Sequence, residues 1–175
     1  SYVSSKGRRF TELMQAADED NVVSVWCLIP HQGGLRDEEG FTALMYAVQA
    51  GHYEVARILY DLEGRVKNTN GETALMLAAA SGFTRIANML MIKEAGERDN
   101  QGRTALMRAA IYNHGDVIRL LLQKEGGIQD SRGETALMFA AKANNPDAVR
   151  LLLDKEGGKR MLVKQHGRNG TQLKG

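Results

Sequence analysis

The chain has 175 residues, 43% hydrophobic and 25% charged, which is the composition of a folded globular protein and excludes wholesale disorder. Its formal net charge is only +2, with 23 basic and 21 acidic residues interspersed, so no strong field exists to collect nucleic acid or acidic lipid. Cys27 is the only cysteine, which excludes an intrachain disulfide and a secreted fold that depends on one.

The sequence has no stretch of about 18 apolar residues and no charged-then-apolar leader. We therefore expect no membrane span and a cytoplasmic location, with any association with the cytoskeleton or the nucleus arising through a partner. The segment after Asp154 is locally basic. We interpret it as a solvated end, and a membrane or RNA contact through it is the weaker alternative.

A four-residue phrase, Thr-Ala-Leu-Met, recurs along the chain at a fixed step of 31 residues. It begins at Thr42, Thr73, Thr104 and Thr135, and one step earlier Thr11 opens Thr-Glu-Leu-Met in the same register. A fixed period in this range indicates stacked repeats, whose surface binds other molecules and whose interior rarely hosts chemistry. The sequence therefore predicts one elongated all-α domain over 1–175, a solenoid of about five helix-turn-helix repeats and a partial sixth.

The first repeat is irregular in a way that is typical of a capping unit. Ser24 replaces an apolar residue of the second helix, Pro30 falls near the end of that helix, and no turn glycine precedes Thr11. Cys27 aligns with Ile58 and its equivalents, so we expect a small buried hydrophobe rather than a nucleophile. Trp26 aligns with polar residues, so we expect it outside the core, covering the cap or clamping residues 1–10. The predicted parts are an N-terminal extension (1–10), the capping unit (11–36), full units (37–67, 68–98, 99–129, 130–158) and an irregular C-terminal segment (159–175).

Each full unit is predicted to contain a turn and two short antiparallel helices. In the second unit Asp37 and Gly40 supply turn chemistry, and Thr42 stands where a helix needs an N-cap. A second helix has apolar residues at i, i+3, i+4 and i+7 from Val55 onward. Between the two helices we expect a left-handed turn residue, because only Gly, Asn and Asp adopt that conformation cheaply. The residues at this position are Asp20, Gly51, Gly82, Asn113 and Asn144.

Two further repeated positions are interpreted as structural. The methionines of the phrase, Met14, Met45, Met76, Met107 and Met138, are expected in the core between units rather than in a copper-binding or redox-active stripe. A glutamate recurs as Glu63, Glu94, Glu125 and Glu156. Successive copies should lie about 10 Å apart, too far to share a proton. We expect them to form ion pairs across units with Lys93, Lys124 and Lys155, each worth under about 1 kcal/mol.

No arrangement typical of an enzyme is found. His31, His52, His114 and His166 do not share one repeat position and form no ligand cluster, so we interpret them as ordinary surface histidines and expect no metal. The sequence contains no P-loop, dinucleotide-binding or kinase motif. We therefore expect no catalytic residues, no cofactor and no small-molecule substrate.

These residues identify a family resemblance. The pattern Gly-x-Thr-Ala-Leu-Met-x-Ala-Ala, then Gly, then Val-x-x-Leu-Leu-Leu and a further Gly resembles the ankyrin repeat over residues 11 to 158. It departs from that family in having Ala for the usual Pro, Met for the usual His, and a period of 31 rather than about 33 residues. The Met variant resembles the ankyrin arrays of diplomonad protozoa, which occur alone or beside kinase domains. Because Met replaces a polar linking group, we expect the stack to rely more on apolar packing.

The resemblance implies a non-catalytic scaffold that binds a partner protein of unknown identity through its concave surface, the turn tips and the exposed edge of each first helix. The positions to inspect are the residue before each Thr and those four, seven and eight after it. Several of them hold residue types that dominate binding hot spots. The predicted partner-binding residues are Phe41, Tyr46, Leu77, Arg103, Arg108, Tyr112 and Phe139. The remaining seventh and eighth positions hold Gln49, Ala50, Ala80, Ser81, Ile111, Lys142 and Ala143.

The C-terminal end leaves two alternatives open. The 31-residue step places the next threonine at position 166, which is His166, and residues like the opening of a sixth unit stand five positions later, at Gly170-Thr171-Gln172-Leu173. Either the last full unit exposes a helical face that the tail or a partner covers, or the chain continues in a longer protein. In the second case it would be the targeting segment of a larger protein kinase. We expect a monomer unless the C-terminal face pairs.

Overall fold

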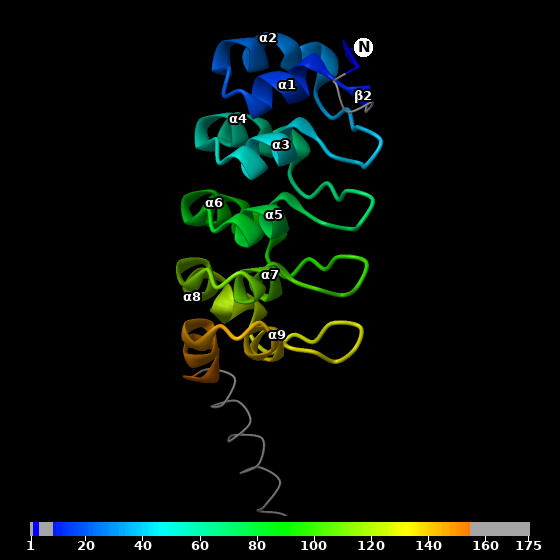
Figure 1. Cartoon of the computed structure of the whole chain (residues 1–175). Helices are drawn as coiled ribbons and strands as arrows, with labels where there is room; N and C mark the ends of the chain where they lie inside the picture. The colour runs from blue at the N-terminus through cyan, green and yellow to red at the C-terminus, as the bar shows by residue number, and fades with distance from the viewer. Residues whose placement is uncertain (1, 4–8, 155–175) are drawn as a thin grey trace, which may run out of the picture.

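The computed structural model describes residues 2–3 and 9–154, which form a stack of paired helices (Figure 1). Ten helices lie within these residues, and the only strands among them are a two-residue antiparallel pair with Tyr2 opposite Phe10. The predicted all-α fold class is confirmed. The labelled elements are β1 (Tyr2–Val3), β2 (Arg9–Phe10), α1 (Glu12–Asp18), α2 (Val22–Gln32), α3 (Ala43–Ala50), α4 (Tyr53–Glu63), α5 (Ala74–Ser81), α6 (Thr84–Glu94), α7 (Ala105–Ile111), α8 (Gly115–Glu125) and α9 (Ala136–Lys142), and a further helix covers 146–154.

The helices form two parallel rows, and the turns extend from one side of the stack. Helices α1, α3, α5, α7 and α9 are the first helices of successive units and pack on one another, while α2, α4, α6 and α8 form the row of second helices (Figure 1). The turns project beyond the first helices, away from the second row (Figure 1). We call the surface made by the turns and the exposed edges of the first helices the turn-side surface.

Local chemistry places the helix ends as predicted. The five threonines that open the repeated phrase each cap a first helix. Each accepts a hydrogen bond from the backbone N–H of the methionine three residues later. The residue nine positions after each threonine has positive φ in every unit, from 56° at Asp20 to 79° at Gly51. This conformation reverses the chain into the second helix. The period of 31 residues is therefore built from repeated backbone geometry.

Neighbouring turns are joined by backbone hydrogen bonds. Thr69 N–H donates to the Glu39 carbonyl over 2.9 Å, and Ser131 N–H donates to the Gln101 carbonyl over 3.0 Å. Within each turn a buried Asp or Asn oxygen accepts two backbone N–H groups, as Asp37 does from Glu39 and Phe41. Because these bonds satisfy the polar backbone of the turns, the turn-side surface is held in one geometry along the stack.

The core runs between the units, and the two ends of the stack account for two wrong predictions. Met45, Met76 and Met107 are at most 1% exposed, as expected, but Met138 is 38% exposed because no described unit packs beyond it. Cys27, expected in the core, is exposed. At the position equivalent to Cys27, Leu151 lies against Gly115 in the second helix of the preceding unit, whereas no second helix is described before α2 to provide such a contact.

Within the described residues, no helix combines the length and the apolar character needed to cross a membrane. Trp26 is 61% exposed, outside the core as predicted. Its expected contact with residues 1–10 falls largely outside the described residues, as do Glu156, Lys155, His166 and the segment 159–175.

Candidate partner-binding surface

At the N-terminal part of the turn-side surface, three aromatic rings form a cluster. The Tyr46 ring meets Phe10 edge-on with centroids 5.0 Å apart, and the centroid of the tilted Phe41 ring lies 5.7 Å from that of Tyr46. The Tyr46 hydroxyl donates to Asp37 Oδ2 over 2.5 Å. Tyr46 and Phe41 are both half-buried, so each has a face for solvent and a face for the scaffold. The structure thus brings two predicted site residues together with Phe10.

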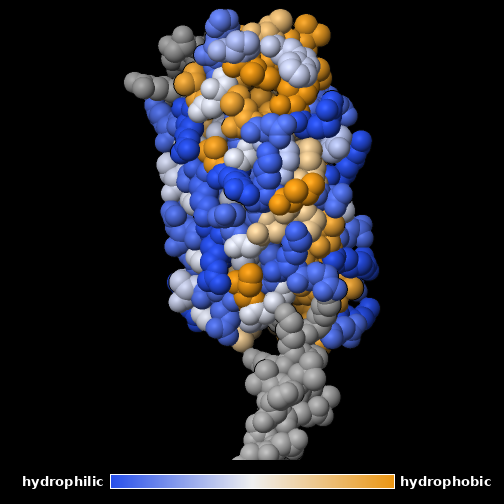
Figure 2. All heavy atoms as spheres, turned by 180° about the vertical axis from the view of Figure 1, so that it is seen from behind, coloured by the Kyte–Doolittle hydropathy of each residue, from blue (hydrophilic) through white to orange (hydrophobic). Residues whose placement is uncertain are grey.

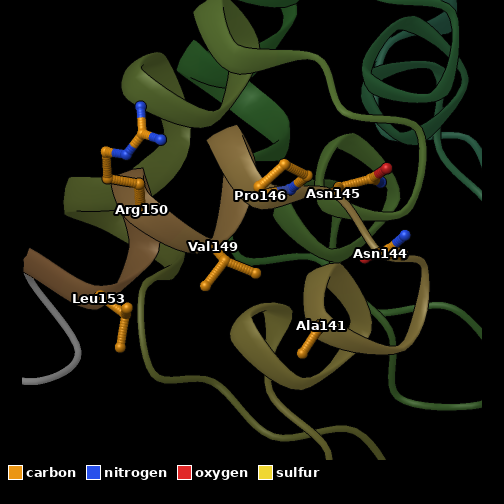
Figure 3. Close-up of a pocket in the computed structure, with 7 residues that line it drawn as sticks. All are labelled: Ala141, Asn144, Asn145, Pro146, Val149, Arg150 and Leu153. Atoms are coloured by element: carbon orange, nitrogen blue, oxygen red, sulfur yellow. The ribbon is translucent and has the colours of Figure 1, made fainter.

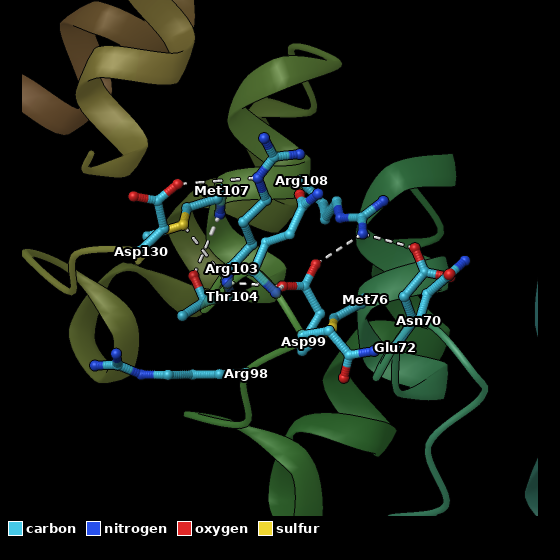
Figure 4. A network of polar contacts seen from close by, with 12 residues as sticks. Asn70, Glu72, Met76, Arg98, Asp99, Arg103, Thr104, Met107, Arg108 and Asp130 are labelled. Carbon is cyan, nitrogen blue, oxygen red and sulfur yellow. Dashed lines mark hydrogen bonds and ion pairs between the residues drawn. The ribbon is translucent and has the colours of Figure 1, made fainter. Parts of the chain in front are cut away.

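In the middle of the surface, Arg108 links two units through ion pairs (Figure 4). Its guanidinium lies 2.6 Å from Glu72 Oε1 of the preceding unit and 3.0 Å from Asp99 Oδ2 of its own turn. The Arg108 side chain is only 20% exposed, and its buried Nε makes no hydrogen bond with any described group. Breaking such a pair leaves carboxylates without their counter-charge, so Arg108 also stabilises the scaffold.

A second arginine completes this network nearer the C-terminal end. Arg103 lies over the Phe139 ring, 5.0 Å from its centroid, with Nε 4.0 Å from Asp130 Oδ2 (Figure 4). Desolvation alone would raise the pKa of Asp130, but the backbone N–H groups of Glu134 and Arg132 and the charge of Arg103 together lower it. The Asp130 carboxylate therefore holds its charge beside Arg103.

The turn of the third unit has Asn68 where the other full units have Asp. The first-helix residue that faces this turn position is Leu77, which has no donor to offer a second carboxylate oxygen. Asn68 instead donates its own side-chain amide to Glu72 Oε2 over 2.8 Å. Asn68 Oδ1 still accepts the two turn N–H groups. The fifth unit meets the same lack of a first-helix donor differently, because Phe139 stands at the matching position and the second oxygen of Asp130 lies 4.0 Å from Arg103 Nε.

The seven predicted site residues differ in what they offer to a partner. Leu77 and Phe139 are 8% exposed, so the expectation that these positions are free from packing is wrong for both. Both apolar side chains belong to the hydrophobic core instead. Tyr112 is 55% exposed and has the largest free surface of the seven. Phe41, Tyr46, Arg103 and Arg108 are half-buried.

A row of buried glutamates ties each second helix to two other parts of the stack. Glu63 Oε1 accepts the N–H of Gly34 in the preceding unit over 2.9 Å, and Oε2 accepts the N–H of Leu44 over 2.7 Å. Glu94 and Glu125 make the same two contacts one and two steps later, with Arg65 and Leu75 and with Gly96 and Leu106. Burial is the largest influence on all three and raises their pKa above 4.5.

The ion pairs expected for these glutamates are therefore wrong. Each described glutamate of the row is 1% exposed and is held by backbone N–H groups, whereas Lys93 pairs with Asp61 of the preceding unit over 2.9 Å. The equivalent residue of the capping unit is Gln32, whose Oε1 accepts only the Leu13 N–H. The sequence did carry a signal for this role, because every unit has Gln or Glu at this position. Both side chains can accept a hydrogen bond from the backbone N–H of the first helix.

Two of the histidines that were expected to be ordinary surface residues contact the neighbouring unit. His52 and His114 stand two repeat steps of 31 residues apart, and each ring reaches the last turn of the preceding first helix. His52 Nε2 lies 2.8 Å from the Asp18 carbonyl, and His114 Nε2 lies 2.9 Å from the Ala80 carbonyl. They link units rather than only facing solvent. The stack is thus held by polar bonds as well as by the expected apolar packing.

The last described unit presents an open hollow of about 420 Å³ (Figure 3). It lies between α9 and the following helix, with Ala141, Val149 and Leu153 on its walls. In the preceding unit the equivalent place is occupied, because Asn145 donates its amide to the Ala110 carbonyl over 2.9 Å. The hollow is therefore the contact face of a repeat. Among residues 2–3 and 9–154, no group of three or more His, Cys, Asp or Glu is placed to hold a metal ion.

Comparison with known families matches nearly all of the repeat region. A family model described as ankyrin repeats (3 copies) matches residues 4–68 and 62–131. A second, described as ankyrin repeats (many copies), matches residues 122–169. A comparison with curated proteins gives no match.

Proposed function

The chain belongs to the ankyrin-repeat family, and from that premise we propose that it is a non-catalytic scaffold that binds a partner protein through its turn-side surface. Repeats of this family generally mediate protein–protein interaction. The partner contacts in this proposal come from Phe41, Tyr46, Arg103, Arg108 and Tyr112, while the buried Leu77 and Phe139 support the surface from beneath.

The observation that carries the proposal is a constant backbone with changing exposed side chains. The turns repeat the same hydrogen bonds from unit to unit, whereas each of the four full units exposes a different residue at the outer edge of its first helix. These residues are Gln49 and Lys142, seven positions after the threonine of their units, and Ser81 and Tyr112, eight positions after it. Because none of these side chains is needed in the core, their differences support a role in recognising another molecule.

The chemistry of the surface limits the kind of contact a partner can make. Arg108 already faces two carboxylates, and Arg103 faces Asp130, so neither arginine presents an uncompensated charge. They offer guanidinium edges and apolar stems, and Arg103 lies over the buried Phe139 ring. We therefore expect a partner that contributes apolar or aromatic groups and hydrogen-bond acceptors, with a weak dependence of affinity on salt.

The test has two stages. Affinity capture with the purified chain and mass spectrometry identify a partner, and calorimetry then compares its affinity for three proteins. In the test variant, Gln49→Ala and Tyr112→Ala alter the turn-side surface without touching the Arg108 network. In the control variant, Arg57→Ala and Arg119→Ala alter exposed residues of the second helices, whose side chains are 57% and 62% exposed.

The test variant should bind at least about tenfold more weakly, because hot-spot truncations cost 2 kcal/mol or more, while the control should bind like the wild type. Equal affinity of the test variant and the wild type would remove the turn-side surface as the binding site. So would a loss of affinity confined to the control variant.

A further inference from the structure

The tips of the turns are polar and enclose a hollow. Each full unit exposes two polar residues at its tip, from Glu38-Glu39 in the second unit to Ser131-Arg132 in the fifth. In Figure 2 the turns lie along the left edge, where hydrophilic residues predominate, whereas apolar atoms gather at the upper end of the molecule. Between the turns of the third and fourth units lies an open hollow of about 260 Å³. We call it the polar hollow, and it is lined by Asn70, Glu72, Asp99, Asn100, Gln101 and Arg108.

The polar hollow is large enough for the end of a side chain from another molecule. Its volume of about 260 Å³ is several times the roughly 30 Å³ that one water molecule occupies in the liquid. The three amide side chains around it are exposed. Its charged side chains lie deeper, because those of Glu72, Asp99 and Arg108 are only 12%, 3% and 20% exposed. A group that enters the hollow therefore meets buried charges inside a rim of exposed amides.

The charged groups of the polar hollow leave one negative charge without a counter-charge. Both carboxylates meet the same nitrogen of Arg108, Nη2, which lies 2.6 Å from Glu72 Oε1 and 3.0 Å from Asp99 Oδ2 (Figure 4). Two negative charges and one positive charge leave a net charge of −1. The Asn68 amide also donates to Glu72, and two backbone N–H groups donate to Asp99, but these donors are neutral.

The neighbouring gaps between turns have different chemistry. At the position of Glu72, the gap between the second and third units has Phe41, and the gap between the fourth and fifth units has Arg103. Arg103 places a positive charge near Asp130 instead of a second carboxylate. The carboxylate of Glu72 is therefore specific to the gap that forms the polar hollow.

This arrangement favours a cation over the other groups that a partner could insert. An anion would add to the surplus of negative charge, and an apolar group would remove water from the carboxylates without replacing its hydrogen bonds. A cationic side chain supplies the missing positive charge, and its N–H groups find acceptors in the carboxylates and the amide oxygens. Asn100 provides such an oxygen, because its Nδ2 donates to the Thr69 carbonyl over 2.9 Å and its Oδ1 is the acceptor.

We propose that the polar hollow binds a positively charged side chain, lysine or arginine, of the partner protein. This inference rests on the proposed function and adds one cationic group to the apolar groups and acceptors expected of the partner. Tyr112 stands four residues after Arg108, so an exposed aromatic ring lies on the same side of the first helix as the hollow. Because Glu72 and Asp99 are largely enclosed, salt screens this contact little, in agreement with the weak salt dependence expected above.

NMR titration of the full chain with short peptides tests the hollow without a known partner. Three blocked five-residue peptides of Gly and Ser have lysine, arginine or acetyl-lysine at the centre, and the side-chain amide signals of Asn70, Asn100 and Gln101 are followed. The lysine or arginine peptide should shift these signals with a dissociation constant of about 1 to 10 mM, because one side chain makes only part of an interface. The acetyl-lysine peptide lacks the charge and should bind at least about tenfold more weakly.

Two isosteric variants and a matched control locate the contact. Glu72→Gln and Asp99→Asn each remove the surplus negative charge, so each should weaken binding of the charged peptides at least about tenfold. Asparagine is compatible with this turn, because Asn68 accepts the two turn N–H groups in the third unit. The control is Glu134→Gln, at the same repeat position as Glu72 and with a side chain 19% exposed, which should bind like the wild type. Circular dichroism verifies that each variant remains folded.

Three results would overturn the inference. Neither charged peptide could shift the three amide signals at concentrations up to about 10 mM. The acetyl-lysine peptide could bind as tightly as the lysine peptide. Finally, both isosteric variants could bind the charged peptides as tightly as the wild type.

A captured partner separates this inference from the proposed function. Its affinity for Glu72→Gln should fall at least about tenfold, whereas its affinity for Glu134→Gln should not change. If the partner bound Glu72→Gln like the wild type but bound the Gln49→Ala and Tyr112→Ala variant more weakly, the polar hollow would not be its contact. The turn-side surface would then remain its binding site.

Discussion

Replacing Glu94 with glutamine should destabilise the protein more than any isosteric change on its surface. Glu94 is 1% exposed, and its two carboxylate oxygens accept the N–H of Arg65 over 2.9 Å and the N–H of Leu75 over 2.7 Å. The hydroxyl of Thr73 also hydrogen-bonds to it. Glutamine has a single carbonyl oxygen, so its amide NH₂ must face one of the backbone donors. One buried N–H then loses its acceptor.

The size of the effect follows from the hydrogen bonds lost. A hydrogen bond to a charged group contributes about 1.5–3 kcal/mol, and a buried donor left unsatisfied costs about 1–3 kcal/mol. Removing a buried charge offsets part of this loss. We expect Glu94→Gln to lower the free energy of unfolding by about 2 kcal/mol at neutral pH. For a chain of this length that corresponds to a fall in Tm of about 4–8 °C.

Urea and thermal unfolding followed by circular dichroism measure the loss, and hydrogen exchange at the Arg65 and Leu75 amides locates it. The control is Glu54→Gln on α4, whose side chain is 55% exposed and pairs only with Arg57 one turn away. That variant should lie within about 0.5 kcal/mol of the wild type. If Glu94→Gln is equally harmless and both amides stay protected, the buried glutamates do not hold the units together and the reasoning is refuted.

The pH dependence of this difference provides a second check. Burial is the dominant influence on Glu94 and raises its pKa above 4.5 in the folded state, while the three hydrogen bonds act in the opposite direction. The folded state therefore binds this proton more tightly than the unfolded state. The contribution of Glu94 is largest below pH 4.5 and declines as the pH rises through the folded pKa. The stability gap between the wild type and Glu94→Gln should narrow from acid to neutral pH, and a widening gap would show that the hydrogen bonds outweigh burial.

Three other comparisons have directions that the structure decides, all measurable by urea unfolding. Residues 65 and 96 both have positive φ, 69° and 89°. Arg65→Gly should therefore raise the free energy of unfolding by about 1 kcal/mol, and Gly96→Ala should lower it by about as much. If both substitutions changed the free energy of unfolding in the same direction, this account would be contradicted. Arg108→Leu should cost about 2 kcal/mol, because it leaves the buried Asp99 carboxylate without its counter-charge. Adding Asp99→Asn should recover part of this loss by removing that charge, and a double variant less stable than the single one would refute this account. Tyr46→Phe should cost about 1 kcal/mol by removing the hydroxyl bond to its turn, and an unchanged stability would show that this bond contributes nothing.

The sequence predicted those features that depend on residues close to one another in the chain. The N-cap at Thr42 and the left-handed residue at Asn113 act within a few positions of the chain, so residue type alone was sufficient. The contacts of Glu63 connect residues 19 and 29 positions apart, and no local pattern distinguishes a buried acceptor from a surface charge. Alignment of equivalent positions also assumes a neighbour on both sides. That assumption fails at the two ends of the described stack, where Cys27 and Met138 are exposed.

The same limit applies to the candidate binding surface. Aligning the units showed which positions vary, but it could not show that some of them vary together. Tyr46 and Arg108 each donate a hydrogen bond to the aspartate of their own turn. Leu77 cannot, and the asparagine of its turn donates to Glu72 instead. In the second and fourth units, the fourth position of the first helix is therefore constrained by its turn as well as by any partner. Exposed residues such as Tyr112, one turn further along the helix, are under less constraint from the scaffold. If the turn-side surface recognises a partner, its specificity should change most readily at these outer positions, because a substitution there leaves the bonds of the turn intact.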